Sequence, residues 1–313
     1  MVHINAGLMT GRVMRSTGSW YIVLTDEGAL RACRVRGKLR LEDSRESNPV
    51  AVGDRVRLAL DSADATIVEV LDRTNHIVRQ SARKAGHSHV IAANVDQALL
   101  LATISHPRTS TGFIDRFLVT CEAYGIPQLL VINKQDLLLR DDLELALAIL
   151  DLYGGLGVTT FLVSLKDETG VAALELQLNG KTTLITGHSG TGKSTLLNRL
   201  LPDARQSVGE ISAFSEKGVH TTTVAEMFRI GTETFVIDTP GIKEWGLLDM
   251  KPQEISDYFP EMRDRRRSCR FGSRCLHVHE PECAILNAVE EGTVSASRYH
   301  NYLSMVSGDD NRK

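Results

Sequence analysis

Residues Gly187-His188-Ser189-Gly190-Thr191-Gly192-Lys193-Ser194 satisfy the phosphate-binding pattern G-x-x-x-x-G-K-[ST]. A short β-rich segment, 182–186, precedes this stretch, and residues 194–201 follow it with helical spacing as far as Pro202. Strand, glycine-rich loop and helix together let backbone N–H groups and a helix N-terminus converge on a phosphate group. The stretch therefore predicts a nucleotide-binding loop in an α/β domain, the alternative being a glycine-rich turn that matches by chance.

Within this loop, the residue types suggest separate tasks. Lys193 is placed to reach the β and γ oxygens of a nucleotide, and Ser194 to hold Mg²⁺ through its hydroxyl. The expected nucleotide-contacting residues are Gly187, His188, Ser189, Gly190, Thr191, Gly192, Lys193, Ser194 and Thr195.

The residues before the loop alternate between buried strands and helices. Apolar runs at 96–104, 128–132 and 158–163 are typical of strands covered on both faces, and helical stripes lie at 113–121, 143–152 and 171–178. This alternation predicts a mostly parallel sheet whose ligand lies at the carboxyl ends of the strands.

A second motif stands at the end of the 128–132 strand, where the sequence reads Asn133-Lys134-Gln135-Asp136. A carboxylate there can accept hydrogen bonds from N1–H and the exocyclic amine of guanine, which adenine does not offer, so Asn133, Lys134 and Asp136 are expected to select the base. Ser164, after the next strand, is expected to contact the base from a second loop. The alternative for Asp136 is an N-cap of a helix.

Downstream of the phosphate loop, a third motif reads Asp238-Thr239-Pro240-Gly241. Asp238 is expected to hold Mg²⁺, commonly through water, and the Gly241 N–H to face the γ-phosphate. The threonines at 221–223 offer a hydroxyl to the same ion, and the expected magnesium residues are Ser194, Thr221, Thr222 and Asp238. A polar loop and an ordinary turn are the alternatives.

The residue that orients the attacking water is less evident. Ile242 follows the Asp238 motif, at a position where many GTPases have a glutamine, and an aliphatic side chain cannot orient water. We expect slow intrinsic turnover, with Lys193 and His220 as catalytic residues and His220 brought into place when its loop becomes ordered. The alternative is that His220 only caps or packs that loop.

The first seventy residues have the pattern of a small β-barrel. About five short strands are indicated, and from Cys33 to Leu41 apolar residues alternate with a cationic stripe formed by Arg34, Arg36, Lys38 and Arg40. This favours a barrel of the oligonucleotide-binding (OB) type whose stripe contacts RNA, although a charged edge that resists aggregation is the alternative. Residues 73–90 are expected to form a flexible basic linker.

Composition limits the class of protein. The chain has 313 residues, 42% of them hydrophobic, and a net charge of −3, which favours a multidomain globular protein without a global attraction to nucleic acid. No apolar run is long enough to span a bilayer, and no secretory signal is evident, so we expect a cytoplasmic protein without a membrane partner. Cys33 and Cys121, isolated in apolar segments, are expected to be buried thiols.

Three further cysteines and a histidine are grouped near the C-terminus. Cys269, Cys275, His277 and Cys283 offer four ligands for a closed tetrahedral Zn²⁺ site of structural type, with free buried thiols as the alternative. Residues 261–275 carry a local charge of +4, and Arg265, Arg266 and Arg267 are expected to contact RNA phosphate, unless they only form an exposed helical face.

The order of these motifs resembles one family. The guanine motif and Ser164 precede the phosphate loop, whereas ordinary GTPases place them after the Asp-x-x-Gly motif, so the order is circularly permuted. With a leading barrel and a trailing cysteine cluster, nearly the whole chain resembles the bacterial small-subunit-dependent GTPases of the RsgA/YjeQ type. The family usually has one residue fewer between its first two cysteines, which leaves open whether Cys269 closes the zinc site or His279 replaces one of the ligands.

The resemblance implies GTP hydrolysis to GDP and phosphate, stimulated by the small ribosomal subunit, in a late assembly factor that binds ribosomal RNA. It implies an OB-fold RNA-binding domain over residues 1–72, a circularly permuted GTPase domain over 73–248 and a small helical zinc domain over 249–313. Guanine nucleotide, Mg²⁺ and one structural Zn²⁺ are the expected cofactors of a monomer. Two other functions stay open: an RNA-binding scaffold with a vestigial nucleotide site, and an ATP-using phosphotransferase.

Overall fold

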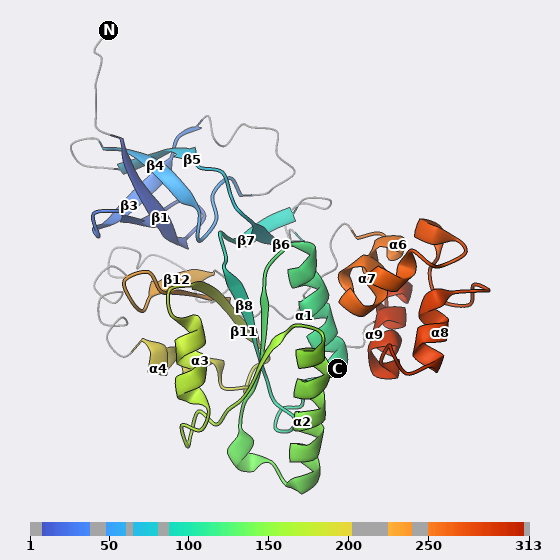
Figure 1. The fold of residues 1–313 in the computed structure, drawn as a ribbon. Helices are drawn as coiled ribbons and strands as arrows, with labels where there is room; N and C mark the ends of the chain where they lie inside the picture. The colour runs from blue at the N-terminus through green and yellow to red at the C-terminus, as the bar shows by residue number, and fades with distance from the viewer. Residues whose placement is uncertain are drawn as a thin grey trace. The chain divides into compact units, whose positions relative to one another are not determined.

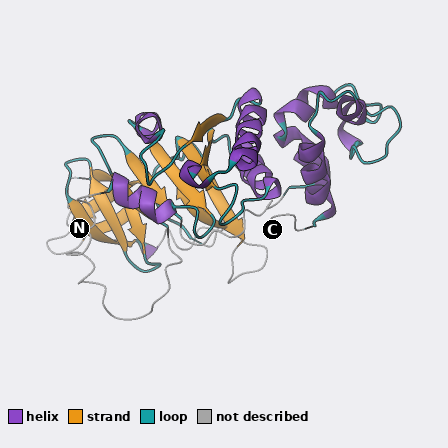
Figure 2. Cartoon of the chain, turned by 90° about the horizontal axis from the view of Figure 1, so that it is seen from below, coloured by secondary structure: helices purple, strands orange, loops and turns teal. Residues whose placement is uncertain are grey.

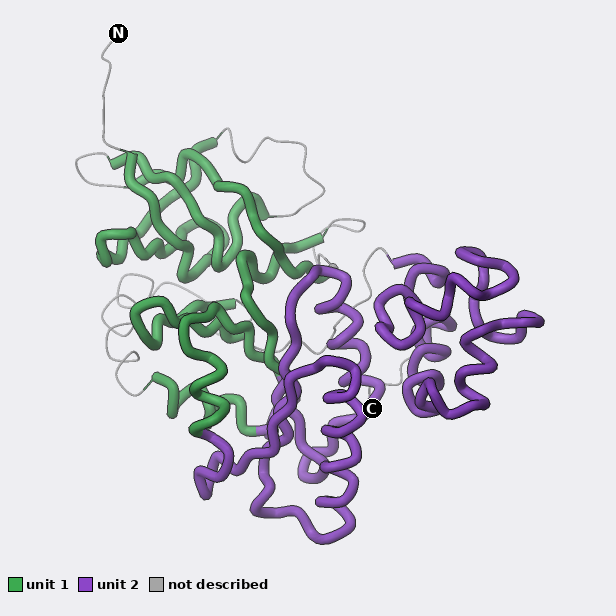
Figure 3. Tube along the Cα trace, in the orientation of Figure 1, with its two compact units in different colours: residues 1–99, 172–186, 192–243 green, residues 100–171, 187–191, 244–313 purple. Residues whose placement is uncertain are grey.

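The computed structural model describes residues 8–37, 48–60, 65–80, 88–201, 225–239 and 250–309 (Figure 1). The chain divides into two compact units (Figure 3). One contains residues 1–99, 172–186 and 192–243, and the other contains residues 100–171, 187–191 and 244–313. The division passes through the phosphate loop, with residues 187–191 in one unit and 192–194 in the other.

The first unit begins with a five-stranded barrel. Its strands are β1 (Met9–Ser16), β2 (Tyr21–Thr25), β3 (Leu30–Val35), β4 (Arg55–Leu60) and β5 (Ala65–Val70). β1 pairs with β2 and β4, β3 pairs with β2 and, in parallel, with β5, and β4 pairs with β5, so every strand has two neighbours in the barrel. Closure removes the exposed edges that a small open sheet would present. The predicted barrel is confirmed.

Side chains alternate across the barrel wall as the sequence pattern predicts. Val23, Leu58 and Ile67 belong to an apolar cluster inside the barrel. On β3, Cys33 is buried and Arg34 is exposed, because successive side chains of a strand point to opposite faces. Burial raises the pKa of the Cys33 thiol to about 11, which is consistent with an inert core residue.

The segment after the barrel is not the linker that we predicted. Strands β6 (His76–Gln80) and β7 (Ser88–Ala93) form an antiparallel pair. The Asn75 side chain fixes the base of this pair, since it accepts a hydrogen bond from the Val95 N–H and donates one to the Val95 carbonyl, each at 2.8 Å. β6 has two apolar side chains of five, and the four of β7 come at its end, at 90–93, so the mostly polar and charged stretch between them concealed the pair.

The remainder of the first unit positions the phosphate loop. β11 (Thr182–Gly187) pairs in parallel with β13 (Phe235–Asp238), and β12 (Glu226–Arg229) runs antiparallel to β13. β12 also pairs with β1, with Arg15 opposite Glu226, which joins the barrel to this sheet. Helices α3 (Val171–Leu178) and α4 (Lys193–Leu200) are linked by a 2.7 Å ion pair between Arg199 and Glu175.

The second unit supplies the strands that carry the guanine motif. β8 (Gln97–Ala102) enters this unit at Leu100, and β9 (Gln128–Ile132) pairs in parallel with β10 (Thr159–Leu162). Helices α1 (Thr111–Ala123) and α2 (Arg140–Gly155) belong to the same unit. α1 begins where the Ser110 hydroxyl accepts a hydrogen bond from the Phe113 N–H, which satisfies one of the unpaired N–H groups of the first turn. The predicted strands and helices of this region are confirmed.

The described part of the end of the chain consists of short helices joined by loops (Figure 2). α6 (Pro252–Ile255), α7 (Pro260–Arg266), α8 (Ala284–Glu290) and α9 (Ala296–Ser307) are joined with two 3₁₀ turns, η3 (Ser256–Tyr258) and η4 (Gly272–Arg274). Their common core includes Phe259, Met262 and Tyr302, and Val119 of α1 packs into it.

A buried ion network also fixes this helical region to the strands and helices of the second unit. The Arg298 and Asp115 side chains are 2% and 0% exposed, and their charged groups are 2.5 Å apart. Glu261 of α7 pairs with the same guanidinium at 2.5 Å, while Tyr153 and Asn301 donate hydrogen bonds to the Asp115 carboxylate at 2.7 and 2.6 Å. A buried pair of this kind depends on all of its partners, because removal of one leaves a charge without compensation.

Candidate functional site

The phosphate loop, Gly187–Ser194, connects β11 to α4. A Cβ atom on Gly187 would lie 2.4 Å from the Leu101 carbonyl oxygen and 2.9 Å from the Thr191 hydroxyl, so only glycine fits there. Gly190 and Gly192 have φ angles of +86° and +105°, which other residues rarely adopt. The conformation therefore depends on glycine at the predicted positions, and it places Lys193 and Ser194 at the start of α4.

Lys193 and Asp238 come together beside this loop. In the parallel pair, Asp238 lies opposite Ile185, so the carboxyl end of β13 meets the end of β11 from which the loop departs. The Lys193 ammonium is 2.6 Å from the Asp238 carboxylate and 3.4 Å from the Thr239 carbonyl oxygen. One cationic group and one carboxylate at the same point are what a phosphate with its Mg²⁺ ion requires.

Asn133 connects the guanine motif to the phosphate loop. Its side-chain amide donates a 2.8 Å hydrogen bond to the carbonyl of Thr191, which is part of the loop. Its side-chain oxygen accepts a 3.1 Å hydrogen bond from the Leu165 N–H, next to Ser164. Asn133 is buried, so these bonds form out of water, where an unpaired group is costly. Two sequence motifs that are 58 residues apart thus meet at one side chain.

Asp136 and Ser164 are direct neighbours. The Ser164 hydroxyl donates a 2.8 Å hydrogen bond to the Asp136 carboxylate and accepts one from the Asp167 N–H at 3.1 Å. Asp136 lies in a 3₁₀ turn, η2 (Gln135–Leu137), whose N-cap residue is Lys134, so Asp136 caps no helix. Its carboxylate is fixed at the carboxyl ends of β9 and β10, where it was expected to read the base.

Two lysine contacts near Asp136 were not predicted from the sequence. The Lys166 ammonium is 3.8 Å from the Asp136 carboxylate, although the Lys166 side chain is largely exposed. Lys134 donates a 2.5 Å hydrogen bond to the His106 carbonyl, which ties the guanine motif to the loop after β8. A lysine two residues after Ser164 was a signal for the first; nothing local indicated the second.

His188 belongs to the phosphate loop and also packs against a neighbouring helix. Its ring lies against Phe113 of α1, with centroids 3.9 Å apart. Burial lowers the pKa of His188, so the ring is neutral at neutral pH and its side chain adds no positive charge to the phosphate site. The loop is therefore anchored on α1 by a neutral aromatic contact.

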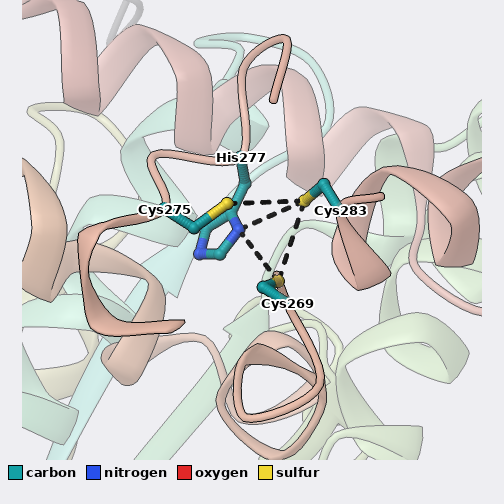
Figure 4. Close-up of side chains that lie close together, drawn as sticks. All are labelled: Cys269, Cys275, His277 and Cys283. Carbon is teal, nitrogen blue, oxygen red and sulfur yellow. Dashed lines mark hydrogen bonds between the residues drawn. The ribbon is translucent and has the colours of Figure 1, made fainter. Parts of the chain in front are cut away.

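A second site lies in the helical region, where Cys269, Cys275, His277 and Cys283 point toward one another (Figure 4). Cys283 Sγ is 3.8 Å from the sulfur atoms of Cys269 and Cys275, and His277 Nδ1 is 3.3 Å from Cys283 Sγ and 3.6 Å from Cys269 Sγ. Tetrahedral Zn²⁺, with bonds of about 2.3 Å to sulfur and about 2.0 Å to nitrogen, separates two sulfur ligands by roughly 3.8 Å and sulfur from nitrogen by roughly 3.5 Å. Four of the six distances among these buried ligand atoms thus agree with tetrahedral zinc, and all four atoms lie within 4.8 Å of one another.

The loop that carries these ligands is held by its neighbours. The Glu280 carboxylate accepts hydrogen bonds from the N–H groups of Leu276, Val278 and His279. Tyr299 and Tyr302 of α9 donate hydrogen bonds to the carbonyls of His277 and Leu276, each at 2.7 Å. His279 itself is exposed and stands outside the group, so the set that the structure brings together is the one written from the sequence, Cys269 included.

The predicted RNA-binding arginines differ in their surroundings. Arg34 and Arg36 are exposed on the barrel and Arg267 is exposed after α7. Arg265 donates a 2.7 Å hydrogen bond to the Glu261 carbonyl, and Arg266 is paired with Asp257. The structure thus places the last two partly in internal contacts.

Several predicted residues lie outside the described residues. They are Lys38, Arg40, His220, Thr221, Thr222, Thr223, Gly241 and Ile242. Within the described ranges, no helix has the length and apolar character that a membrane span requires.

Comparisons with known proteins agree on one family. The sequence model of the RsgA GTPase matches residues 70–248, and that of the RsgA N-terminal domain matches residues 10–68. A small ribosomal subunit biogenesis GTPase RsgA 2 from Bacteroides thetaiotaomicron is 48% identical over 299 residues, covering 95% of this chain and 96% of the relative. The RsgA protein of Flavobacterium johnsoniae is 44% identical over 306 residues, covering 96% and 94%.

Solved structures show the same likeness over the whole length. The crystal structure of YjeQ from Thermotoga maritima superposes with a TM-score of 0.78 at 34% identity and covers 98% of this chain and 100% of that one. YloQ, described as a circularly permuted GTPase, has a TM-score of 0.75 at 30% identity and covers 100% and 99%.

Proposed function

The chain belongs to the RsgA GTPase family, and from this premise we propose which of its residues carry out the family's reaction. The protein is a GTPase of small ribosomal subunit maturation that converts GTP to GDP and phosphate. The comparisons give no support to the scaffold or to the ATP-using phosphotransferase.

We propose one guanine nucleotide site built from both motifs. The observation that carries this proposal is the hydrogen bond from Asn133 to the Thr191 carbonyl, because it joins the guanine motif to the phosphate loop within one compact unit. Asp136, held by Ser164, reads the base. The remaining nucleotide contacts come from Lys134, from residues 187–195, and from Asp238 and the Gly241 N–H.

Catalysis by these residues is mainly electrostatic. Lys193 stabilises the negative charge that develops between the β and γ phosphates, as its position beside Asp238 allows. Mg²⁺, when bound, neutralises phosphate charge, and Ser194 and Asp238, with Thr221 or Thr222, would hold it. His220 is the proposed residue that orients the attacking water, and stimulation by the small subunit follows from ordering of its loop.

The helical region is proposed to hold one structural Zn²⁺ through Cys269, Cys275, His277 and Cys283. The distances among the four ligand atoms support this set. A closed site with four protein ligands leaves no position for substrate, so the ion would stabilise the loop rather than take part in hydrolysis.

RNA contact is proposed at two basic surfaces. On the barrel the residues are Arg34, Arg36, Lys38 and Arg40, and in the helical region they are Arg265, Arg266 and Arg267. Exposure of Arg34, Arg36 and Arg267 supports phosphate contact by these three. We further propose that residues 1–72, 73–248 and 249–313 act as RNA-binding, GTPase and zinc domains of a cytoplasmic monomer.

GTP turnover with and without purified small ribosomal subunits tests this function. We expect slow turnover alone, clear stimulation by subunits, and loss of both rates in Lys193→Ala. His220→Ala is expected to lose stimulation while it still binds GTP, and Arg229→Ala, away from the phosphate loop on β12, serves as the matched control. Absence of stimulation in the unaltered chain would contradict the proposal, and unchanged stimulation in His220→Ala would remove only that assignment.

A further inference from the structure

Trp20 stands on the outer wall of the barrel. Tyr21, the next residue, is 3% exposed and belongs to the barrel core, whereas Trp20 is 36% exposed and is absent from that core. The two side chains point to opposite faces because they are adjacent at the start of β2. The Trp20 carbonyl accepts hydrogen bonds from the Thr17 N–H at 2.9 Å and the Thr17 hydroxyl at 3.2 Å, so a turn fixes the backbone that presents the indole.

Arg34 lies against this indole. β2 and β3 are antiparallel with Tyr21 opposite Cys33, and continuation of this register places Arg34 opposite Trp20. The Arg34 guanidinium carbon is 4.1 Å from the centroid of the Trp20 ring, a cation–π contact. A planar cation and a large aromatic ring are therefore held together on one exposed surface.

The arginines of β3 differ from those of the other strands in their partners. Arg55 pairs with Asp26 and Arg57 pairs with Glu69, at 2.7 and 2.6 Å. Within the described residues, no ion pair is formed by the exposed β3 side chains Arg31 and Arg34, or by Arg36 just beyond the strand. Among the described residues, the charges of Arg34 and Arg36 beside the indole are thus not paired with an acidic side chain.

We propose that Trp20 and Arg34 form a stacking site for an unpaired base of single-stranded RNA. Bases in single strands stack on aromatic rings and on guanidinium planes, whereas bases in a duplex are already stacked and offer no free face. Arg36, two residues from Arg34 and therefore on the same face, supplies the accompanying phosphate contact. The inference rests on the proposed RNA-binding role of the barrel and refines it, since it names the class of RNA and the side chains that distinguish it.

A fluorescence titration tests the stacking directly. The sequence contains two tryptophans, so the full-length Trp245→Phe chain reports on Trp20 alone. Single-stranded oligoadenylate is expected to quench this fluorescence saturably, and an RNA duplex of equal length is not. If oligoadenylate binds without changing the signal, the stacking proposal is wrong.

Affinity and salt dependence separate stacking from charge. With a labelled oligoadenylate, Trp20→Leu is expected to weaken binding roughly 5- to 100-fold and Trp20→Phe less, both with an unchanged slope of log affinity against log salt. Arg36→Ala, just beyond β3 on the face of Arg34, is the charge control and is expected to lower that slope by about one. Thermal melts check that each variant is folded.

The outcomes also distinguish this inference from the function on which it rests. If Trp20→Leu and the unaltered full-length chain bind oligoadenylate with equal affinity, the stacking site is wrong and RNA binding by the barrel still stands. No binding of oligoadenylate at low salt would overturn both, while stimulation of GTP turnover by subunits is measured independently.

Discussion

Asn133 shows at the scale of one residue how the nucleotide site is held together. Its side chain uses both its donor and its acceptor, one toward the phosphate loop and one toward the loop after β10. An asparagine in this position therefore organises two loops even before it meets a ligand. The same arrangement explains why the motif could be recognised from sequence: strand ends in a parallel sheet collect their polar residues at one edge.

Asn133→Ala is expected to weaken GDP binding by about 2–3 kcal/mol, because it leaves the Thr191 carbonyl and the Leu165 N–H without partners. Titration of a fluorescent GDP analogue measures the change. Gln135→Ala, two residues along in the same motif, is the control and is expected to bind normally. An affinity equal to that of the unaltered chain would show that Asn133 does not support the nucleotide site.

Asp136→Asn is expected to move base preference from guanine to xanthine nucleotides. An amide can no longer accept both hydrogen bonds of guanine, but it can donate one to the additional carbonyl of xanthine. Competition of GTP, XTP and ATP against labelled GDP measures the preference. Asp167→Asn, on the neighbouring loop, is the control, and preserved guanine preference in Asp136→Asn would refute base reading by Asp136.

At the scale of elements, helix α9 serves two contacts at once. Arg298 and Asn301, three residues apart, bind Asp115 of α1. Tyr299 and Tyr302, also three residues apart, donate hydrogen bonds to carbonyls of the loop that carries the metal ligands. Residues at this spacing share a helix face, so one face of α9 contacts α1 and an adjacent face contacts the metal-ligand loop.

Arg298→Met is expected to destabilise the chain by about 3–5 kcal/mol, because the Asp115 carboxylate would stay buried without its cation. Combining it with Asp115→Leu is expected to recover part of that loss, since the Asp115 charge is then removed as well and only Glu261 is left without its cation. Urea unfolding of the two single variants and the double variant measures the coupling. The exposed pair Arg140–Glu144, 88% and 65% exposed, is the control and is expected to show a coupling below about 0.5 kcal/mol. Additive losses at Asp115 and Arg298 would contradict the expectation.

Elements with a strong local pattern were predictable from sequence, and those that depend on distant partners were not. The bounds of β9 and α3 agree with the apolar periodicity of their segments. β6 and β7 were missed because mostly polar and charged residues at 79–89 separate their apolar residues, and because the Asn75–Val95 hydrogen bonds that support the pair join distant positions. The Asp115–Arg298 pair joins residues 183 apart, and neither residue differs locally from an exposed charge on a helix. Most of the nucleotide-site and metal-site predictions were based on glycine, lysine and cysteine residues at fixed spacings.

At the scale of the molecule, the metal site and the nucleotide site are expected to respond separately to chelation. Treatment of the nucleotide-free protein with a zinc chelator is expected to release about one equivalent of Zn²⁺ per chain and to lower the melting temperature, since the ligand loop then loses the ion that joins its four side chains. Thiol titration is expected to detect Cys269, Cys275 and Cys283 after chelation and not before, because their buried sulfur atoms would bind the ion until it is removed.

Cys283→Ser tests the ligand set, and Cys121→Ser is its matched control. Cys283 lies within 3.8 Å of each of the other three ligand atoms, so its loss is expected to prevent stoichiometric zinc binding. Cys121→Ser changes a buried thiol that lies outside the cluster and is expected to keep the ion. A protein prepared with zinc present that nevertheless contains none would refute the zinc assignment.

The anchoring of α9 on Asp115 has a practical consequence for genetic dissection. A fragment that stops at residue 248 would expose the apolar surface around Val119 and leave the Asp115 carboxylate without its guanidinium partner. Its GTPase activity would therefore reflect impaired folding as well as the loss of the helical region. Point changes on solvent-facing arginines, Arg267 for example, remove one contact at a time and leave that anchorage whole. Truncation therefore changes both the folding of this protein and its contacts with a partner, whereas substitution of an exposed residue changes the contacts alone.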